Sequence, residues 1–335
     1  MLNTNKIAGL DSLRFFAFLS VFLFHSTGMF KFGYLGIDFF FVLSSFLLTF
    51  LALNEIKTTN NFSKINFFVR RSLRIYPLFF LVLLFTFIII PHLLGFYNQK
   101  ITLPENKFFY YFFLSNFDVS DHVFALKFLW SIAIEEQFYL LFLLLSLFFK
   151  RNFFLPILIL CFVYLIYNVI ASVFHWNTYF NTLNYFADFA VGMGIAKLFY
   201  YLSKIHLRLI VAALLLSALI CYGFYQINYL LYFVKLPLAV FFSVIVLFTV
   251  KIFSFPFVSK NKIFLLTEYL GKYTFGLYVY SGFIISFGSK FIWIENLWLR
   301  FFLQLLLLFF ISFFSYHFFE KPFLQLKSRF RFHHP

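Results

Sequence analysis

Long apolar runs alternate with short polar segments along the whole chain. An α-helix needs about 20 predominantly apolar residues to cross a bilayer, and ten runs come close to that length. We therefore expect an all-α integral membrane protein with about ten transmembrane helices in one bundle, forming a single membrane domain over residues 1–335. The expected spans lie near 10–30, 34–53, 75–96, 129–149, 153–174, 181–200, 207–226, 229–250, 268–289 and 297–319.

The composition agrees with a polytopic membrane protein, since 63% of residues are apolar, 26% are aromatic and only 12% are charged. Soluble domains carry about 25% charged residues. The net charge of +15 comes from basic residues that punctuate the apolar runs and form no hydrophilic basic face. It therefore indicates membrane topology, and we expect no nucleic-acid partner.

Lysine and arginine favour the cytoplasmic side of a membrane. With the N-terminus inside, the inner segments hold 19 of the 27 basic residues and the outer segments seven, leaving out Arg14 within the first span. We expect both termini in the cytoplasm. The longest outer segment, 97–128, contains the cluster FFYYFF and is either a loop at the membrane interface or a lid over an outward-facing site.

Four ionisable residues interrupt the first two apolar runs: Asp11, Arg14, His25 and Asp38. Each is a candidate functional residue, because a charge inside a span costs about 2.5 kcal/mol or more. Arg14 and His25 are eleven residues apart, which brings them within about 20° on one helix face and roughly 16 Å apart along it. A cation near the inner surface is thus aligned with an imidazole in the outer half of the bilayer.

His25 and Asp38 are expected at similar depths, roughly 6–8 Å inside the outer surface, on antiparallel spans. A carboxylate beside an imidazole fixes its tautomer and raises its basicity, which suits a general base. The alternative is a buried polar pair that only holds two helices together.

A basic motif, FFVRRSLRIYPLFF, occupies residues 67–80. It places Arg70 and Arg74 on one face as the third span begins, with Arg71 beside them. Pro77 is expected in the first turns of that helix, where its missing N–H matters least. The three arginines either bind an anionic group or anchor the span on its inner side.

An acidic motif, LWSIAIEEQFYLLF, opens the fourth span at residues 129–142. Glu135 and Tyr139 share a helix face, Glu135 is expected roughly 9 Å below the outer surface, and Trp130 is expected as an interface anchor. Glu135 is the better candidate for binding hydroxyl groups or supporting His25, and Glu136 the weaker one.

Together these motifs resemble membrane acyltransferase family 3, the O-antigen and exopolysaccharide O-acetylase type. The resemblance rests on Arg14-x10-His25 followed by GYLGIDFFFVLSSFLLT, on the basic and acidic motifs, on GKYTFGLYVYS at 271–281 and on FFEKPF at 318–323. Two positions depart from the family pattern. Tyr280 stands where the family has His, and Ser45 stands where it has Gly, a small residue expected at a close helix approach.

The resemblance implies an enzyme of the bacterial cytoplasmic (inner) membrane, an O-acyltransferase domain without a fused hydrolase-like domain. It would move an acyl group, acetyl in the first instance, from cytoplasmic acyl-coenzyme A to a hydroxyl of a surface polysaccharide, lipopolysaccharide or other glycan. His25 would be the general base or accept the acyl group itself, with Asp38 or Glu135 orienting it. Arg14, Arg70, Arg71 and Arg74 would hold the phosphates of coenzyme A, and Trp130, Ser131 and Tyr139 would meet the acceptor. No metal is expected.

Two other classes of function remain open. A transporter or flippase of a lipid-linked sugar would show an inverted internal repeat with broken helices, and no such symmetry is evident in the sequence. A membrane scaffold without catalytic activity would tolerate the loss of His25. Cys161 and Cys221 lie in apolar runs and are expected to pack there without forming a disulfide.

Overall fold

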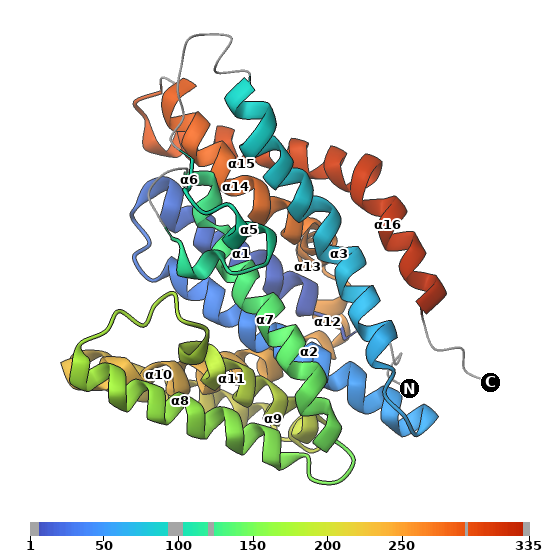
Figure 1. Ribbon diagram of the computed structural model, residues 1–335. Helices are drawn as coiled ribbons and strands as arrows, with labels where there is room; N and C mark the ends of the chain where they lie inside the picture. Colours follow the sequence, from blue (N-terminus) through green and yellow to red (C-terminus); the bar gives the residue numbers. More distant parts are fainter. Residues whose placement is uncertain (1–6, 93–102, 120–123, 292–293, 331–335) are drawn as a thin grey trace. The chain divides into compact units, whose positions relative to one another are not determined.

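The computed structural model describes residues 7–92, 103–119, 124–291 and 294–330, and these residues form helices and no strands (Figure 1). The main elements are α1 Leu10–Thr27, η1 Gly33–Leu35, α2 Gly36–Thr59, α3 Lys64–Leu84, η2 Phe85–Ile89, α5 Phe108–Tyr111, η3 Ser115–Phe117, α6 Phe124–Lys127, α7 Leu129–Leu145, α8 Phe154–Phe174, η5 Thr182–Tyr185, α9 Phe186–Leu202, α10 Leu207–Gln226, η6 Asn228–Phe233, α11 Lys235–Phe253, α12 Pro256–Ser259, α13 Lys262–Leu270, α14 Thr274–Phe291, α15 Leu297–Ser315, η8 Tyr316–Glu320 and α16 Lys321–Leu326.

Seven helices in the described ranges are long and apolar enough to cross a membrane. Each overlaps one of the expected spans. The three other expected spans coincide with α1, α9 and α14, which contain 18, 17 and 18 residues. The all-α membrane class is therefore confirmed, whereas the count of ten spans and the cytoplasmic termini stay predictions.

The chain divides into two compact units. Unit 1 comprises Met1–Val21, Phe32–Phe62 and Leu140–Lys272. Unit 2 comprises Phe22–Lys31, Ser63–Tyr139 and Tyr273–Pro335. The assignment of one membrane domain to the whole chain stays a prediction.

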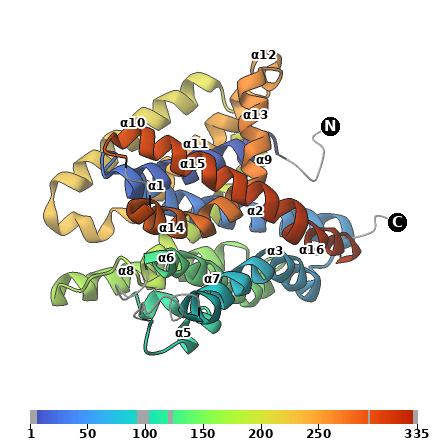
Figure 2. The same cartoon turned by 90° about the horizontal axis from the view of Figure 1, so that it is seen from above.

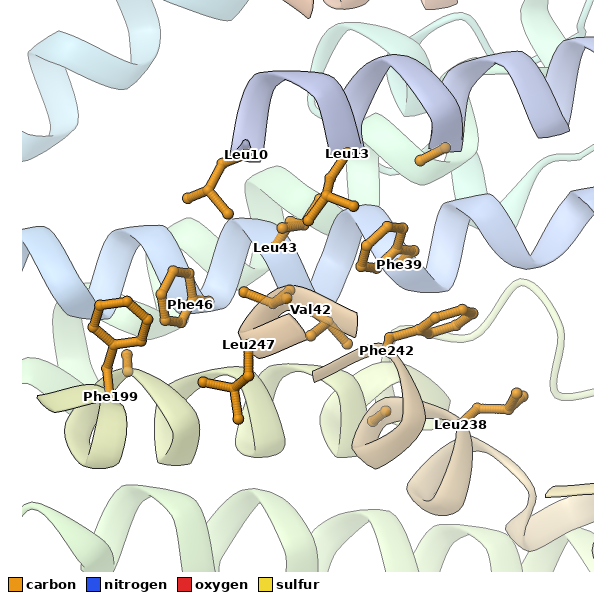
Figure 3. Close-up of a cluster of buried hydrophobic side chains, with 14 residues drawn as sticks. Leu10, Leu13, Phe39, Val42, Leu43, Phe46, Phe199, Leu238, Phe242 and Leu247 are labelled. Carbon is orange, nitrogen blue, oxygen red and sulfur yellow. The ribbon is translucent and has the colours of Figure 1, made fainter. Parts of the chain in front are cut away.

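In unit 1, α2 packs against α9 and α11, α8 packs against α9, and α10 packs against α11 (Figure 1). Figure 3 shows the apolar core between them, with Phe39 and Phe46 of α2 facing Phe242 of α11 and Phe199 of α9. The rings of Phe39 and Phe242 stack with centroids 5.1 Å apart. Leu10 and Leu13 of α1 complete the cluster.

A close approach of α2 and α9 depends on Gly192. A Cβ atom at this position would lie 2.6 Å from the carbonyl oxygen of Val42 and 2.9 Å from the Cβ of Ser45. The Ser45 hydroxyl donates a hydrogen bond of 2.5 Å to the carbonyl of Phe189. The close approach expected near position 45 is therefore present, and Gly192 on the facing helix is the small residue that permits it.

In unit 2, α14 packs against α15 and α6, and α3 packs against α16 (Figure 2). The described part of segment 97–128 belongs to this unit and packs against α3 and α7. Phe113 stacks on Phe79 of α3 at 4.4 Å, and the Gln137 amide of α7 donates 2.8 Å hydrogen bonds to the Phe113 carbonyl and the Asn116 side chain. Phe113 of the aromatic cluster thus fixes this segment to α3, and the role of the segment as a lid stays a prediction.

The expectation that Pro77 lies in the first turns of a helix is wrong. Helix α3 begins at Lys64, where the Ser63 hydroxyl accepts a hydrogen bond from the Asn66 amide, and Pro77 lies inside the helix. The cap extends the helix through the basic motif ahead of the apolar run, so Arg70, Arg71 and Arg74 lie in its middle turns.

We predict that Gly192→Ala destabilises the protein, because the added methyl group must displace the α2 backbone. Overpacking of this kind costs about 1–3 kcal/mol. Thermal unfolding of the purified protein followed by fluorescence measures the effect. Gly194→Ala on the same helix is the matched control, since its Cβ would meet only Ile157 at 3.8 Å. Equal melting temperatures for the two variants would contradict the close approach.

Candidate functional site

Unit 2 contains every predicted site residue except Arg14 and Asp38. The histidine, the basic motif and the acidic motif therefore belong to one compact part of the chain. Contacts within this unit link several of these side chains.

Glu135 and Tyr139 meet on α7, as their spacing predicts: the Tyr139 hydroxyl donates a short hydrogen bond to the Glu135 carboxylate. The guanidinium of Arg71 lies over the Tyr139 ring, 5.6 Å from its centroid, and over Phe67 at 6.0 Å. Cation–π contacts of this length are favourable, so the arginine is held against the acidic motif. The resulting group places a carboxylate, a phenol and a guanidinium side by side.

Glu136, the weaker candidate of the two, is buried, with 3% of its surface exposed. It shares a hydrogen bond with Tyr76 of α3, and Arg71 lies within electrostatic range. One of its oxygens, Oε1, has no hydrogen-bond partner among the described residues. Both glutamates of the motif are thus turned into the protein.

The imidazole of His25 packs edge-on against Phe24 and Phe128, with centroids 4.8 Å away in each case. Phe128 is held in turn by Tyr278 of α14, whose hydroxyl lies 3.2 Å from the Phe128 carbonyl and 2.7 Å from the Ser131 hydroxyl. Glu135 lies within electrostatic range of Tyr278. A chain of contacts therefore connects the histidine with the acidic motif.

Trp130, expected as an interface anchor, has only 5% of its surface exposed. That expectation is wrong, because an anchor presents its ring to the headgroup region. Its assigned role in meeting an acceptor stays a prediction.

The other arginines of the basic motif have protein partners. Arg70 donates a 2.7 Å hydrogen bond to the carbonyl of Phe330, and Arg74 lies within electrostatic range of Glu320. Glu320 accepts a hydrogen bond from Ser315, which is also bonded to Tyr280, the residue that replaces the family's histidine.

In unit 1, Arg14 pairs with Asp11 at 2.9 Å on the first turns of α1. Glu268 of α13 pairs with backbone N–H groups at the N-terminus of this helix. Its carboxylate accepts hydrogen bonds from the amides of Gly9 and Ser12 at 2.7 and 3.3 Å. Arg14 and His25 lie on one continuous helix, as expected.

Asp38 forms a buried ion pair with Lys235, the first residue of α11. The ammonium group also lies 4.4 Å from the centre of the Tyr185 ring. Asp188 of α9 is within electrostatic range of both charges and is fully buried. The predicted pairing of Asp38 with His25 stays a prediction, and unit 1 gives this carboxylate a different partner.

The sequence interpretation missed Lys235 and Asp188. Lys235 was counted with the outer segments, although it lies inside the expected span 229–250, where the criterion that singled out Asp38 could have found it. Asp188 lies inside an expected span, so the criterion that singled out Asp38 could have found it. Their proximity depends on contacts between distant parts of the chain.

The sequence profile of a family described as "Acyltransferase domain" matches residues 7–317. No solved structure matches the chain.

Among curated proteins, O-acetyltransferase OatA of Staphylococcus aureus (strain NCTC 8325 / PS 47) is 36% identical over 152 residues, which cover 41% of this chain and 24% of that protein. Putative peptidoglycan O-acetyltransferase YrhL of Bacillus subtilis is 36% identical over 141 residues, covering 39% and 22%. Peptidoglycan O-acetyltransferase OatA of Listeria monocytogenes is 30% identical over 141 residues, covering 39% and 23%. The matches thus span about a quarter of the length of these relatives.

We predict that Lys235→Met is more destabilising than Asp38→Asn. Breaking a buried ion pair costs about 3–5 kcal/mol because it leaves one charge without compensation. Loss of the lysine leaves the Asp38 carboxylate buried beside a second acid, Asp188, whereas loss of the Asp38 charge leaves the lysine with the Asp188 carboxyl as a neighbour that can ionise in its place. Thermal unfolding of both variants and of the double variant measures the difference.

The double variant should recover part of the loss, since it removes both members of the pair. Equal losses for the two single variants, or additive losses in the double variant, would contradict this account of the ion pair.

Proposed function

We propose that this chain, which belongs to the acyltransferase family, is a membrane enzyme that acetylates a hydroxyl group of a glycan. The observation that carries the proposal is the family match over residues 7–317, which includes His25, the basic motif and the acidic motif. The grouping of these three elements within unit 2 supports a common site.

The proposed donor is acetyl-coenzyme A in the cytoplasm. Its phosphates require cations, and arginine binds phosphate through charge-assisted, often bidentate hydrogen bonds. Arg70, Arg71 and Arg74 occupy consecutive turns of α3, on the side that the Lys and Arg distribution assigns to the cytoplasm. Arg14, already paired with Asp11, is assigned to the same donor.

In the proposed reaction His25 removes the proton from the acceptor hydroxyl as its oxygen attacks the thioester carbonyl. The carbon–oxygen bond of the new ester forms and the carbon–sulfur bond breaks. The proton then passes from the imidazolium to the departing thiolate, giving free coenzyme A. A histidine can serve in both steps because its imidazole accepts a proton on a ring nitrogen and can then donate it.

Glu135 is proposed to bind the acceptor hydroxyl or to orient His25. Its position beside Tyr139 and Arg71, in the same unit as the histidine, supports this role. Asp38 is proposed to act chiefly through its ion pair with Lys235, which holds α2 to α11.

The proposed acceptor is a surface glycan, and two of the relatives are named as peptidoglycan O-acetyltransferases, one of them putatively. Because this chain matches only about a quarter of their length, acceptance of peptidoglycan by this chain is part of the proposal. The proposed location is the bacterial cytoplasmic membrane.

Transfer of labelled acetyl into extracted glycan, by membranes that contain the protein, tests the function. We predict that replacing Arg70, Arg71 or Arg74 by Ala raises KM for acetyl-coenzyme A about tenfold or more, as expected for lost hydrogen bonds to a charged group. Acetyl-dephospho-coenzyme A, which lacks the 3′-phosphate, should be a poorer donor for the wild-type protein. At least one arginine variant should lose this preference.

Arg151→Ala is the matched control, because Arg151 is exposed in a segment also assigned to the inner side. It should keep the wild-type KM. Unchanged donor preference in all three variants would remove the arginines from phosphate binding. Absence of label with wild-type protein, across several acyl donors and glycans, would contradict the proposed function.

A further inference from the structure

Unit 1 contains a cavity of about 850 Å³ to which the reaction described above assigns no role. Its wall is formed by η1, by the segment between α8 and α9, by the end of α10 and by the start of α11. These segments lie at the ends of spans that the Lys and Arg distribution places on the outer side. The volume is within the range of about 300–1,000 Å³ found for small-ligand sites.

Aromatic rings dominate the cavity wall, and most of them carry a polar tip. Trp176, Tyr179, Tyr222, Tyr225 and Tyr232 all line it. The Trp176 ring stacks on Phe174 at 5.6 Å and keeps half of its surface exposed. It is therefore an oriented platform that can receive the flat face of a ligand.

The wall contains two residues that can carry a positive charge, Lys235 and His175. Lys235 lines the cavity, but its ammonium is neutralised by Asp38. Asn184 also lines it with 3% of its surface exposed, and its Oδ1 has no hydrogen-bond partner among the described residues. A buried acceptor of this kind is costly unless a donor reaches it.

Membrane proteins also carry Trp and Tyr at the headgroup level, where these rings anchor the protein. Anchoring alone requires neither a cavity nor a buried amide at its wall. A phosphate-bearing ligand is disfavoured by the pairing of Lys235, and a purely aliphatic ligand would leave the amide unpaired. The combination fits a neutral ligand with apolar ring faces and several O–H or N–H donors.

We infer that this cavity binds a saccharide unit of the acceptor glycan, with its ring stacked on Trp176 and a hydroxyl or amide proton donated to Asn184. The inference rests on the proposed function, which supplies a glycan as the acceptor. The residues that line this binding site all belong to unit 1.

Ligand-observed saturation-transfer NMR on the purified protein in lipid nanodiscs tests the site, with triacetylchitotriose as the neutral saccharide probe. The wild-type protein should transfer saturation to the sugar protons. Trp176→Ala should weaken binding about tenfold, and Asn184→Ala roughly threefold to tenfold, as expected for one lost hydrogen bond.

Trp298→Ala is the matched control, because Trp298 is also a half-exposed tryptophan but belongs to unit 2 and does not line the cavity. It should bind the probe like the wild-type protein. Equal binding by all variants, or no binding by the wild-type protein, would overturn the inference. So would binding of phosphocholine in place of the saccharide, since that result identifies a lipid headgroup site.

The binding measurement separates this inference from the proposed function. Saccharide binding that depends on Trp176, without acetyl transfer, would support the site and contradict the function. Acetyl transfer that is unchanged in Trp176→Ala, without saccharide binding, would support the function and overturn the site.

Discussion

Polar groups inside apolar helices need partners, and this constraint organises both units. A bilayer offers no water to an unpaired charge, so ionisable residues within spans pair with one another or face the protein interior. Unit 1 satisfies the constraint with the Asp38–Lys235 ion pair and with Glu268 at the N-terminus of α1. In unit 2, Tyr139 donates a hydrogen bond to Glu135, and the guanidinium of Arg71 lies over the Tyr139 ring.

The polar contacts of the two units suit different roles. The Asp38–Lys235 pair is buried and links two helices, which suits a structural role. In unit 2, by contrast, the imidazole of His25 is held by aromatic edges, and Phe128 and Tyr278 connect it to the acidic motif. These aromatic contacts position the imidazole that is proposed to act as the general base.

The sequence predicts what depends on local spacing. Apolar runs located the helices, the eleven-residue spacing placed Arg14 and His25 on one helix, and an i, i+4 spacing paired Glu135 with Tyr139. Contacts between distant segments were not predictable in this way. Lys235 reaches Asp38 across 197 positions, and Gly192 lies against Val42 and Ser45 of another helix. The start of α3 was missed because its capped first turns are polar, whereas the expected span followed the apolar run alone.

The most direct test of the account is acetyl transfer from labelled acetyl-coenzyme A into extracted glycan by His25→Ala, measured at equal protein abundance. His206→Ala is the matched control, because His206 is an exposed histidine at the start of α10. The account predicts that transfer is lost in His25→Ala and retained in His206→Ala. Wild-type transfer by the His25 variant would contradict the assignment of His25 as the general base.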